Sequence, residues 1–280
     1  MRKEVSVLKE VFVQKSLVDR LRELLLKNRA EWPLTDLYLA NPVLKSRQCT
    51  TVFGQFVLDF IEGKSREEIR GFVNGAVSTI LTYLLAGGEK DSKLVKDTVK
   101  WVKHQRLKDG GWHWKPTNLV STDAKSEAWI SAGVLATLKK TDAADESYIN
   151  SILKFLKRDW ERTEWRGNPE VTLVYVGAAG LDKNNSMVEK AVKLLEASQL
   201  LNGAWSGYSA GTTKGGIFRT CVVLNGLTSV GLGLGDSSVV KGFRFAQSKL
   251  NEILNAKWGG VLIQGLYSLA NALIQVNLID

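Results

Sequence analysis

The sequence predicts an all-α protein built from paired helices. Apolar residues recur with the 3.6-residue period of a helix along almost the whole chain of 280 residues, and little of it alternates as a strand would. A Gln–Gly–Trp pattern also repeats along the C-terminal two-thirds. No stretch has the composition of an interdomain linker, so residues 1–280 are expected to form one domain.

The helical period sets the bounds of the expected helices. In chain order they are 7–27, 43–60, 67–85, 92–105, 124–139, 146–158, 170–181, 187–199, 217–230, 239–254 and 261–278. Ser65–Glu68 has the pattern of a capping box, and Pro169 suits the first position of a helix. Gly87, Gly180 and Gly231 are expected to end helices, because glycine readily adopts the left-handed conformation found there.

The composition is that of an ordinary globular chain, with 44% hydrophobic and 24% charged residues. The longest apolar stretch, 72–86, is shorter than a membrane span and contains polar side chains. The first residues have no apolar core or cleavage site of a signal peptide. Cys49 and Cys221 lie far apart in the sequence and form no Cys-x-x-Cys motif, so nothing supports a disulfide framework or a cysteine-rich zinc site. A cytoplasmic protein without a transmembrane segment is expected.

Basic residues exceed acidic ones, and the formal net charge is +9. Lys93, Lys96, Lys100 and Lys103 are three to four residues apart and would form one stripe on a helix. Such a stripe can contact phosphates, although a solvated face of an outer helix is the simpler interpretation. No basic motif with interleaved aromatic residues accompanies it, so the sequence argues against nucleic-acid binding.

The repeat is clearest at 199–205, where Gln199, Gly203 and Trp205 keep the pattern Gln-x-x-x-Gly-x-Trp. Degraded copies lie at 105–112, 159–165 and 247–258. Each unit has an amphipathic helix, the turn, and then a more apolar helix rich in small residues. Helices that are apolar all round are buried, so the second helix of each unit is expected inside and the first outside.

The repeated tryptophans, Trp112, Trp165, Trp205 and Trp258, are expected to brace the fold rather than to bind a ligand. A glutamine amide can bond the open end of a helix while it stacks on the indole ring. A glycine between them permits the tight turn.

This repeat resembles the QW motif of the squalene cyclase and protein prenyltransferase superfamily. The resemblance implies an α/α toroid of about five to six helical hairpins, with inner helices around a central cavity. It covers residues 90–280 most clearly, and residues 1–88 are expected to add further hairpins to the ring.

Protein prenyltransferases of this superfamily would imply a zinc ion held by Asp, Cys and His. The segment 120–125 resembles their Asp-x-Cys stretch, with Asp123 kept but Lys125 in the position of the cysteine. The segment 218–227 resembles their His-Thr-Cys helix, with Arg219 in the position of the histidine. Two cations in place of two ligands would repel Zn²⁺, so no metal ion or other cofactor is expected.

The oxidosqualene type of cyclase carries a lone Asp in a Ser-Asp-Cys-Thr-Ala-Glu context, and 122–128 resembles it at Asp123, Glu127 and Ala128. The resemblance implies that Asp123 is a proton donor. On the expected helix Glu127 lies one turn further on the same face, where a second carboxyl group would raise the donor's pKa. The alternative is that Asp123 caps the helix and Glu127 lies in its first turn.

Candidate ligand-binding residues lie near the starts of the expected inner helices and are mostly aromatic, since aromatic side chains line apolar pockets and stabilise cations. They are Trp112, His113, Trp114, Trp129, Tyr175, Tyr208, Phe218, Arg219, Cys221 and Tyr267. Core packing is the alternative role for these side chains. Within the ring, Arg219 would need an acid such as Glu170 or Asp123, or an anion such as a diphosphate.

Three functions remain open. The first is a terpenoid-cyclase-like enzyme that protonates an isoprenoid through Asp123. The second is a toroid that binds an isoprenoid or another apolar small molecule without catalysis. The third is an interaction subunit that contacts a protein partner, or a second copy of itself, through its exposed rim and the lysine stripe.

Overall fold

The computed structural model describes residues 16–28, 38–46, 51–165, 168–206, 213–255, 257 and 261–278. The regular structure of these residues is helical. The β-type pairing printed within them is one isolated antiparallel bridge, between Gln199 and Trp205 in a repeat turn. The prediction of an all-α protein is therefore confirmed.

Five α-helices are described before residue 90, and residues 7–15 of the helix predicted over 7–27 lie outside the described residues. The five helices are α2 (Ser16–Lys27), α3 (Asn41–Lys45), α4 (Thr51–Glu62), α5 (Arg66–Ile69) and α6 (Val73–Leu85). The predictions of single helices over 43–60 and 67–85 are wrong, because each range contains parts of two helices. The capping box at Ser65 and Glu68 is present. The second helix breaks because Phe72 has an extended backbone, with φ −142° and ψ 145°, which no helix can continue.

The later helices lie where the apolar period predicts them, to within a few residues. They are α7 (Lys93–His104), α8 (Ala128–Lys140), α9 (Glu146–Thr163), α10 (Pro169–Ala178), α11 (Ser186–Ala197), α12 (Thr213–Ser229), α13 (Ser237–Ser248), α14 (Leu250–Leu254) and α15 (Val261–Gln275). A short 3₁₀ turn, η3 (Thr117–Leu119), lies in the loop between α7 and α8. The predicted helix 239–254 is divided into α13 and α14.

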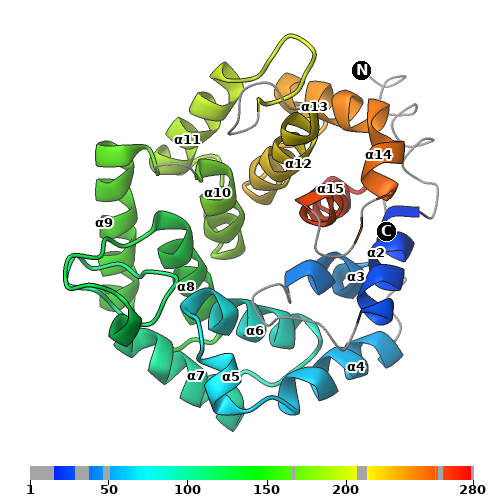
Figure 1. Cartoon of the computed structure of the whole chain (residues 1–280). Coiled ribbons are helices and arrows are strands. Elements are labelled where there is room, and N and C mark those ends of the chain that lie inside the picture. The colour runs from blue at the N-terminus through cyan, green and yellow to red at the C-terminus, as the bar shows by residue number, and fades with distance from the viewer. Residues whose placement is uncertain are drawn as a thin grey trace.

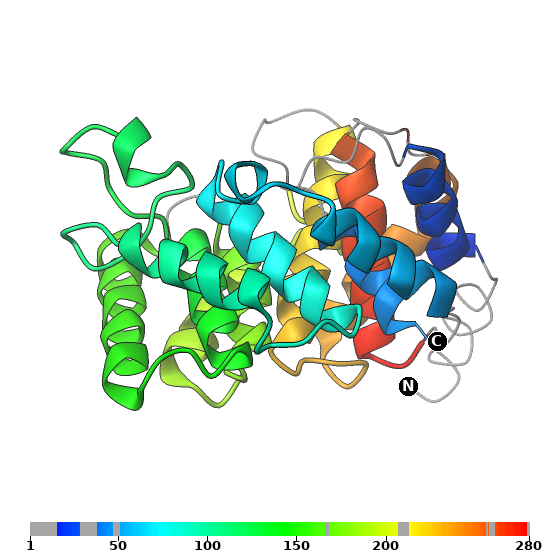
Figure 2. The same ribbon diagram turned by 90° about the horizontal axis from the view of Figure 1, so that it is seen from below.

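The helices form two layers, as Figure 1 shows. Helices α3, α6, α8, α10, α12 and α15 lie inside, and α2, α4, α7, α9, α11 and α13 lie around them. Each inner helix contacts the next one, and α15 contacts α3, so the inner contacts close on themselves. Seen from below, the molecule is flattened, and the loop that carries η3 projects from one end (Figure 2).

The close packing of the inner helices depends on small residues, as the sequence predicts. A Cβ atom on Gly226 of α12 would lie 2.5 Å from the backbone oxygen of Glu170 in α10. One on Gly177 of α10 would lie 2.3 Å from the backbone oxygen of Ser229. Both glycines therefore set the distance between α10 and α12, because any side chain would force the backbones apart.

Three of the four repeated tryptophans brace the fold as predicted, and Trp258 lies outside the described residues. Their indole N–H groups donate hydrogen bonds to backbone oxygens of the preceding outer helix. The pairs are Trp112 with Val102 at 2.7 Å, Trp165 with Leu156 at 3.0 Å and Trp205 with Leu195 at 2.7 Å. All three indoles are at most 1% exposed.

The glutamines of the repeat join neighbouring segments. The Gln199 amide donates to the backbone oxygens of Gly203, at 3.0 Å, and of Ser238, at 2.8 Å, which ties the turn to the start of α13. Gln105 donates to the oxygen of Trp101, near the end of α7, at 3.5 Å. Of these oxygens, that of Trp101 lies in the last turn of a helix, so the expected bond to an open helix end is present for Gln105 and not for Gln199.

Candidate functional site

The two predicted catalytic carboxyl groups do not share a helical face. Helix α8 begins at Ala128 rather than at 124, and Asp123 lies in the preceding loop, where it is exposed. The prediction of a helical pair is therefore wrong. The physical reason is non-local: Glu127 has an extended backbone, and its N–H donates to the oxygen of Trp112 at 2.8 Å, which ties the loop to the repeat turn.

Glu127 itself is half-buried beside three predicted ligand-binding residues. It accepts a hydrogen bond from the backbone N–H of Trp114 at 3.2 Å, and its side chain is also hydrogen-bonded to that of Trp129. Burial raises the pKa of the Glu127 carboxyl group, while the charge of His113 and these two hydrogen bonds act in the opposite direction. Glu127 thus has the kind of surroundings that a general acid needs, and Asp123 does not.

An aromatic cluster surrounds this carboxyl group. The Trp114 ring stacks on Phe72, with centroids 5.5 Å apart, and on His113, at 5.8 Å. The backbone oxygen of Trp114 accepts from the N–H of Val73, which fixes the loop to the start of α6. Phe72 is 40% exposed and was not among the predicted residues. Only the observed helix break places it beside Trp114.

Two tyrosines join helices of the inner layer. Tyr175 of α10 is hydrogen-bonded to Ser78 of α6, and its ring lies against Gly133 of α8. Tyr267 of α15 is hydrogen-bonded to Asn225 of α12. Burial raises the pKa of both phenols. The predicted candidates Tyr175 and Tyr267 therefore both lie on inner helices, where Tyr175 is partly exposed and Tyr267 is buried.

A polar chain runs from Tyr267 to a lysine that sequence analysis missed. The Asn271 amide donates to the side-chain oxygen of Asn225 at 2.5 Å, and the Lys45 ammonium donates to the side-chain oxygen of Asn271 at 2.9 Å. Both asparagines are buried. We call Lys45, Asn271, Asn225 and Tyr267 the inner polar chain. It connects α3, α15 and α12, and residues so distant in sequence gave no local indication of it.

Lys45 combines solvent contact with desolvation. Its side chain is exposed, yet the surrounding protein lowers the pKa of its ammonium to about 8, and the positive charge of Lys140 at the end of α8 adds to this effect. Its described hydrogen-bond partner is an amide oxygen rather than a carboxylate. The inner layer therefore presents an accessible cation that lacks the solvation of an ordinary surface lysine.

Arg219 pairs with Glu170, one of the two acids that the sequence suggests as its partner. Its guanidinium lies 3.8 Å from a carboxylate oxygen of Glu170, and this carboxyl group is almost completely buried. The ion pair joins α12 to α10. Neighbouring Phe218 is half-buried.

Some predicted ligand-binding residues are placed where a ligand cannot reach them. Trp112 and Cys221 are 0% exposed, and burial raises the pKa of the Cys221 thiol to about 12. Both side chains are packed in the core of this structure, and their assignment to a binding site stays a prediction. Tyr208 lies outside the described residues.

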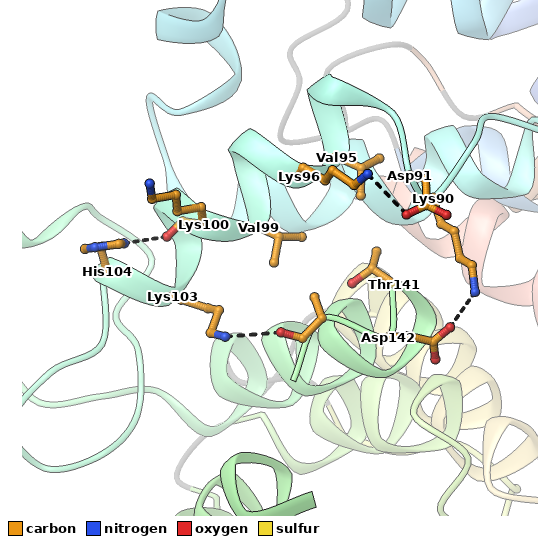
Figure 3. Close-up of a pocket in the computed structure, with 11 residues that line it drawn as sticks. Lys90, Asp91, Val95, Lys96, Val99, Lys100, Lys103, His104, Thr141 and Asp142 are labelled. Atoms are coloured by element: carbon orange, nitrogen blue, oxygen red, sulfur yellow. Dashed lines mark hydrogen bonds and ion pairs between the residues drawn. The ribbon is translucent and has the colours of Figure 1, made fainter. Parts of the chain in front are cut away.

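A separate groove lies on the outer surface, with a volume of about 440 Å³ (Figure 3). It lies between α7 and the turn 141–143 that follows α8. Its lining includes buried Val95 and Val99 together with a row of basic side chains on α7: Lys96, Lys100, Lys103 and His104. Three of the four lysines of the predicted stripe thus line one groove, whereas Lys93 does not and pairs with Asp97 at 3.2 Å.

Two further findings concern metal ions and membranes. Among them, no three of the side chains His, Cys, Asp and Glu gather in a way that could hold a metal ion. None of the described helices is long and apolar enough to cross a membrane.

Comparison with known proteins does not assign the chain to a family. No family model and no curated protein matches the chain.

Proposed function

We propose that the protein is an α/α toroid of the squalene cyclase and prenyltransferase type that binds an apolar, isoprenoid-like ligand with an acidic head group, without cyclising it. The closed contacts of the six inner helices and the Trp-braced turns support the fold assignment. The proposed binding of an acidic head group depends on Lys45, because Lys45 is an accessible, partly desolvated cation within the inner layer.

The acidic head group follows from the charges around Lys45. A cation that has lost part of its solvation gains most from an anion, and Lys140 adds a second positive charge nearby. The Asn271 amide can hold the Lys45 ammonium in place while a carboxylate or phosphate binds it from the accessible side. Such an anion would return the pKa of Lys45 toward its ordinary value.

The apolar tail would lie along the inner helices beyond the inner polar chain. Tyr175 keeps part of its surface exposed although its contacts come from α6 and α8. On α12, Phe218 is also partly exposed and lies two helical turns before Asn225, or about 10 Å along the helix axis. That distance suits a short isoprenoid chain.

Two of the described acids, Asp123 and Glu170, argue against cyclisation. Protonation of carbon needs a carboxyl group that stays neutral in an apolar site. Asp123 is exposed to water, and Glu170 is paired with Arg219. Neither carboxyl group has the surroundings that this chemistry requires.

A comparison of farnesoic acid with farnesol tests the proposal, since the two share a tail and differ in the charge of the head. We expect calorimetry at pH 7 to give at least tenfold tighter binding of farnesoic acid. Lys45→Met should remove this difference, whereas Lys154→Met, on the exposed face of α9, should keep it. Equal affinities for the two ligands in the parent protein, or no binding of either, would refute the proposal.

The cyclase remains a second candidate because of Glu127, whose pKa is raised among aromatic side chains. Incubation with linear isoprenoids, followed by mass spectrometry, tests it. A cyclic product that is lost in Glu127→Gln but kept in Asp123→Asn would identify Glu127 as the acid. Loss in Asp123→Asn alone would support the resemblance-based assignment, and the absence of any cyclic product would exclude this candidate.

A further inference from the structure

We infer that the groove between α7 and the turn 141–143 binds an acidic, extended segment of a partner protein. The groove is on the outer surface and is separate from the inner polar chain, so this inference does not depend on the proposed ligand. We call it the basic groove. Its lining holds four lysines and one histidine against two aspartates, Asp91 and Asp142.

The charges of the basic groove are unevenly distributed. The two aspartates are already engaged at one end, Asp91 with Lys96 at 3.3 Å and Asp142 with Lys90. Further along α7, the exposed Lys100 makes no ion pair among the described residues, and neither does His104 one turn later. His104 instead contacts the backbone oxygen of Lys100 through Nδ1 at 2.6 Å. This end therefore carries uncompensated positive charge.

The Lys103 ammonium is held in position on the opposite wall. It donates to the backbone oxygen of Ala143 at 3.1 Å and lies 4.8 Å from the centre of the Tyr148 ring. Neither contact neutralises its charge. Lys103 and Lys100 both line the groove: the Lys103 side chain extends toward the turn 141–143, and that of Lys100 points away from this turn (Figure 3). An acidic segment could contact both cations only at the rim of the groove, where Lys100 is exposed.

The shape and lining of the basic groove favour a peptide over other polyanions. Among the described residues that line the groove there is no Phe, Tyr or Trp, so His104 is the one ring that could stack on a base. Asp91 and Asp142 would repel a continuous phosphate backbone at one end. Val95 and Val99 form the buried floor of the groove, and the partly exposed Ala143 offers apolar surface that suits an aliphatic side chain of a peptide. A concave groove also fits an extended chain better than the flat surface of a membrane.

The dimensions set the length of the bound segment. Val95 and His104 are nine residues apart on α7, which corresponds to about 14 Å along the helix axis. An extended peptide rises about 3.3 Å per residue, so about four residues would occupy the groove. The expected segment carries two or more Asp or Glu residues next to an aliphatic one.

A labelled peptide provides the test. The probe is a fluorescein-labelled octapeptide of alternating Glu and Leu, and its comparison is the same peptide with Gln in place of Glu. We expect fluorescence anisotropy at 50 mM salt to detect binding of the Glu peptide and at least tenfold weaker binding of the Gln peptide. Added salt should weaken the interaction, because exposed charges are screened.

Matched variants locate the site. Lys100→Glu combined with His104→Glu should weaken binding of the Glu peptide at least tenfold. Lys154→Glu combined with Lys157→Glu, on the exposed face of α9, brings at least as large a change of charge and should alter binding less than twofold. Circular dichroism checks that both variants remain helical; if the groove variant does not, Lys100→Gln replaces it, with a smaller expected loss.

Several results would overturn the inference. They are absence of binding at millimolar peptide, equal binding of the Gln peptide, or equal loss in the two double variants. Binding of a single-stranded RNA oligonucleotide or of vesicles with anionic lipid, lost in the groove variant while the peptide does not bind, would assign the groove to that class instead.

Discussion

At the scale of single residues, Lys45 has surroundings that are unusual for an exposed lysine. Burial and Lys140 lower its pKa from 10.5 to about 8. The unfolded chain therefore binds more protons than the folded one between these two values, so this residue makes the folded state more stable as pH rises through that window. Below about pH 8 the lysine is charged in both states, and its desolvation opposes folding fully.

Competitive labelling measures this directly. With trace acetic anhydride at pH 8, the Lys45 amine should be acylated faster than that of exposed Lys154, because about half of it is neutral. The rate for Lys45 plotted against pH should have its midpoint near 8. A midpoint near that of an ordinary lysine, about 10.4, would contradict the lowered pKa.

The Arg219–Glu170 pair shows what sequence can and cannot supply at this scale. An arginine on a helix that is expected inside a ring needs a nearby anion to offset the loss of water, so the sequence could limit the partner of Arg219 to a few acids or an anionic ligand. Lys45 gave no such indication, because its partner Asn271 is 226 residues away. Lys45 and Asn271 come together only when α15 packs against α3.

At the scale of elements, the contact between α10 and α12 depends on glycine. Gly226→Ala should lower the free energy of unfolding by about 1–3 kcal/mol, because its Cβ would lie 2.5 Å from the backbone oxygen of Glu170 and force the helices apart. Urea denaturation followed by circular dichroism measures the change. The matched control is Gly233→Ala, where no atom lies within 4 Å of the new Cβ. Equal effects of the two substitutions would show that the close approach does not limit stability.

The degraded repeat turn shows why the motif tolerates substitution. Gly110 and Gly203 have positive φ, 96° and 87°, in the turns that retain glycine. Where Thr163 replaces the glycine, Glu164 and Trp165 adopt φ of 51° and 52° instead. Left-handed conformations cost non-glycine residues about 1–2 kcal/mol each. The buried Trp165 indole and its hydrogen bond to Leu156 offset part of this cost.

The helices from α7 onward were predictable because the features that specify them lie within each helix: an apolar period, capping residues, and small residues on the inner helices. The helix breaks at Ser46 and at 70–72 were not, since neither contains a glycine–proline pair or a change of period, and Gly71 is the one residue that favours a helix end. The start of α8 was misplaced for a different reason. The residues 124–127 have helical composition, but the hydrogen bond from Glu127 to Trp112 keeps them extended.

At the scale of the whole molecule, the described inner layer is closed by the meeting of α3, near one end of the sequence, with α15, near the other. Asn271 lies at this closure. Its side chain accepts from Lys45 of α3 and donates to Asn225 of α12, so one residue links three inner helices. Removal of this amide should therefore destabilise α3 and α12 as well as α15.

Asn271→Leu tests this coupling. It removes two hydrogen bonds and leaves the polar groups of Lys45 and Asn225 without this partner, at a cost of about 1–3 kcal/mol for each group that stays buried. Hydrogen exchange followed by mass spectrometry should then become faster in both α3 and α12, while α9 in the outer layer stays unchanged. Asn251→Leu, at an exposed position of α14, is the control and should leave all three helices as they were. Faster exchange confined to α15 would mean that the inner layer closes by apolar packing alone, and that the inner polar chain serves the head group of a ligand rather than the stability of the ring.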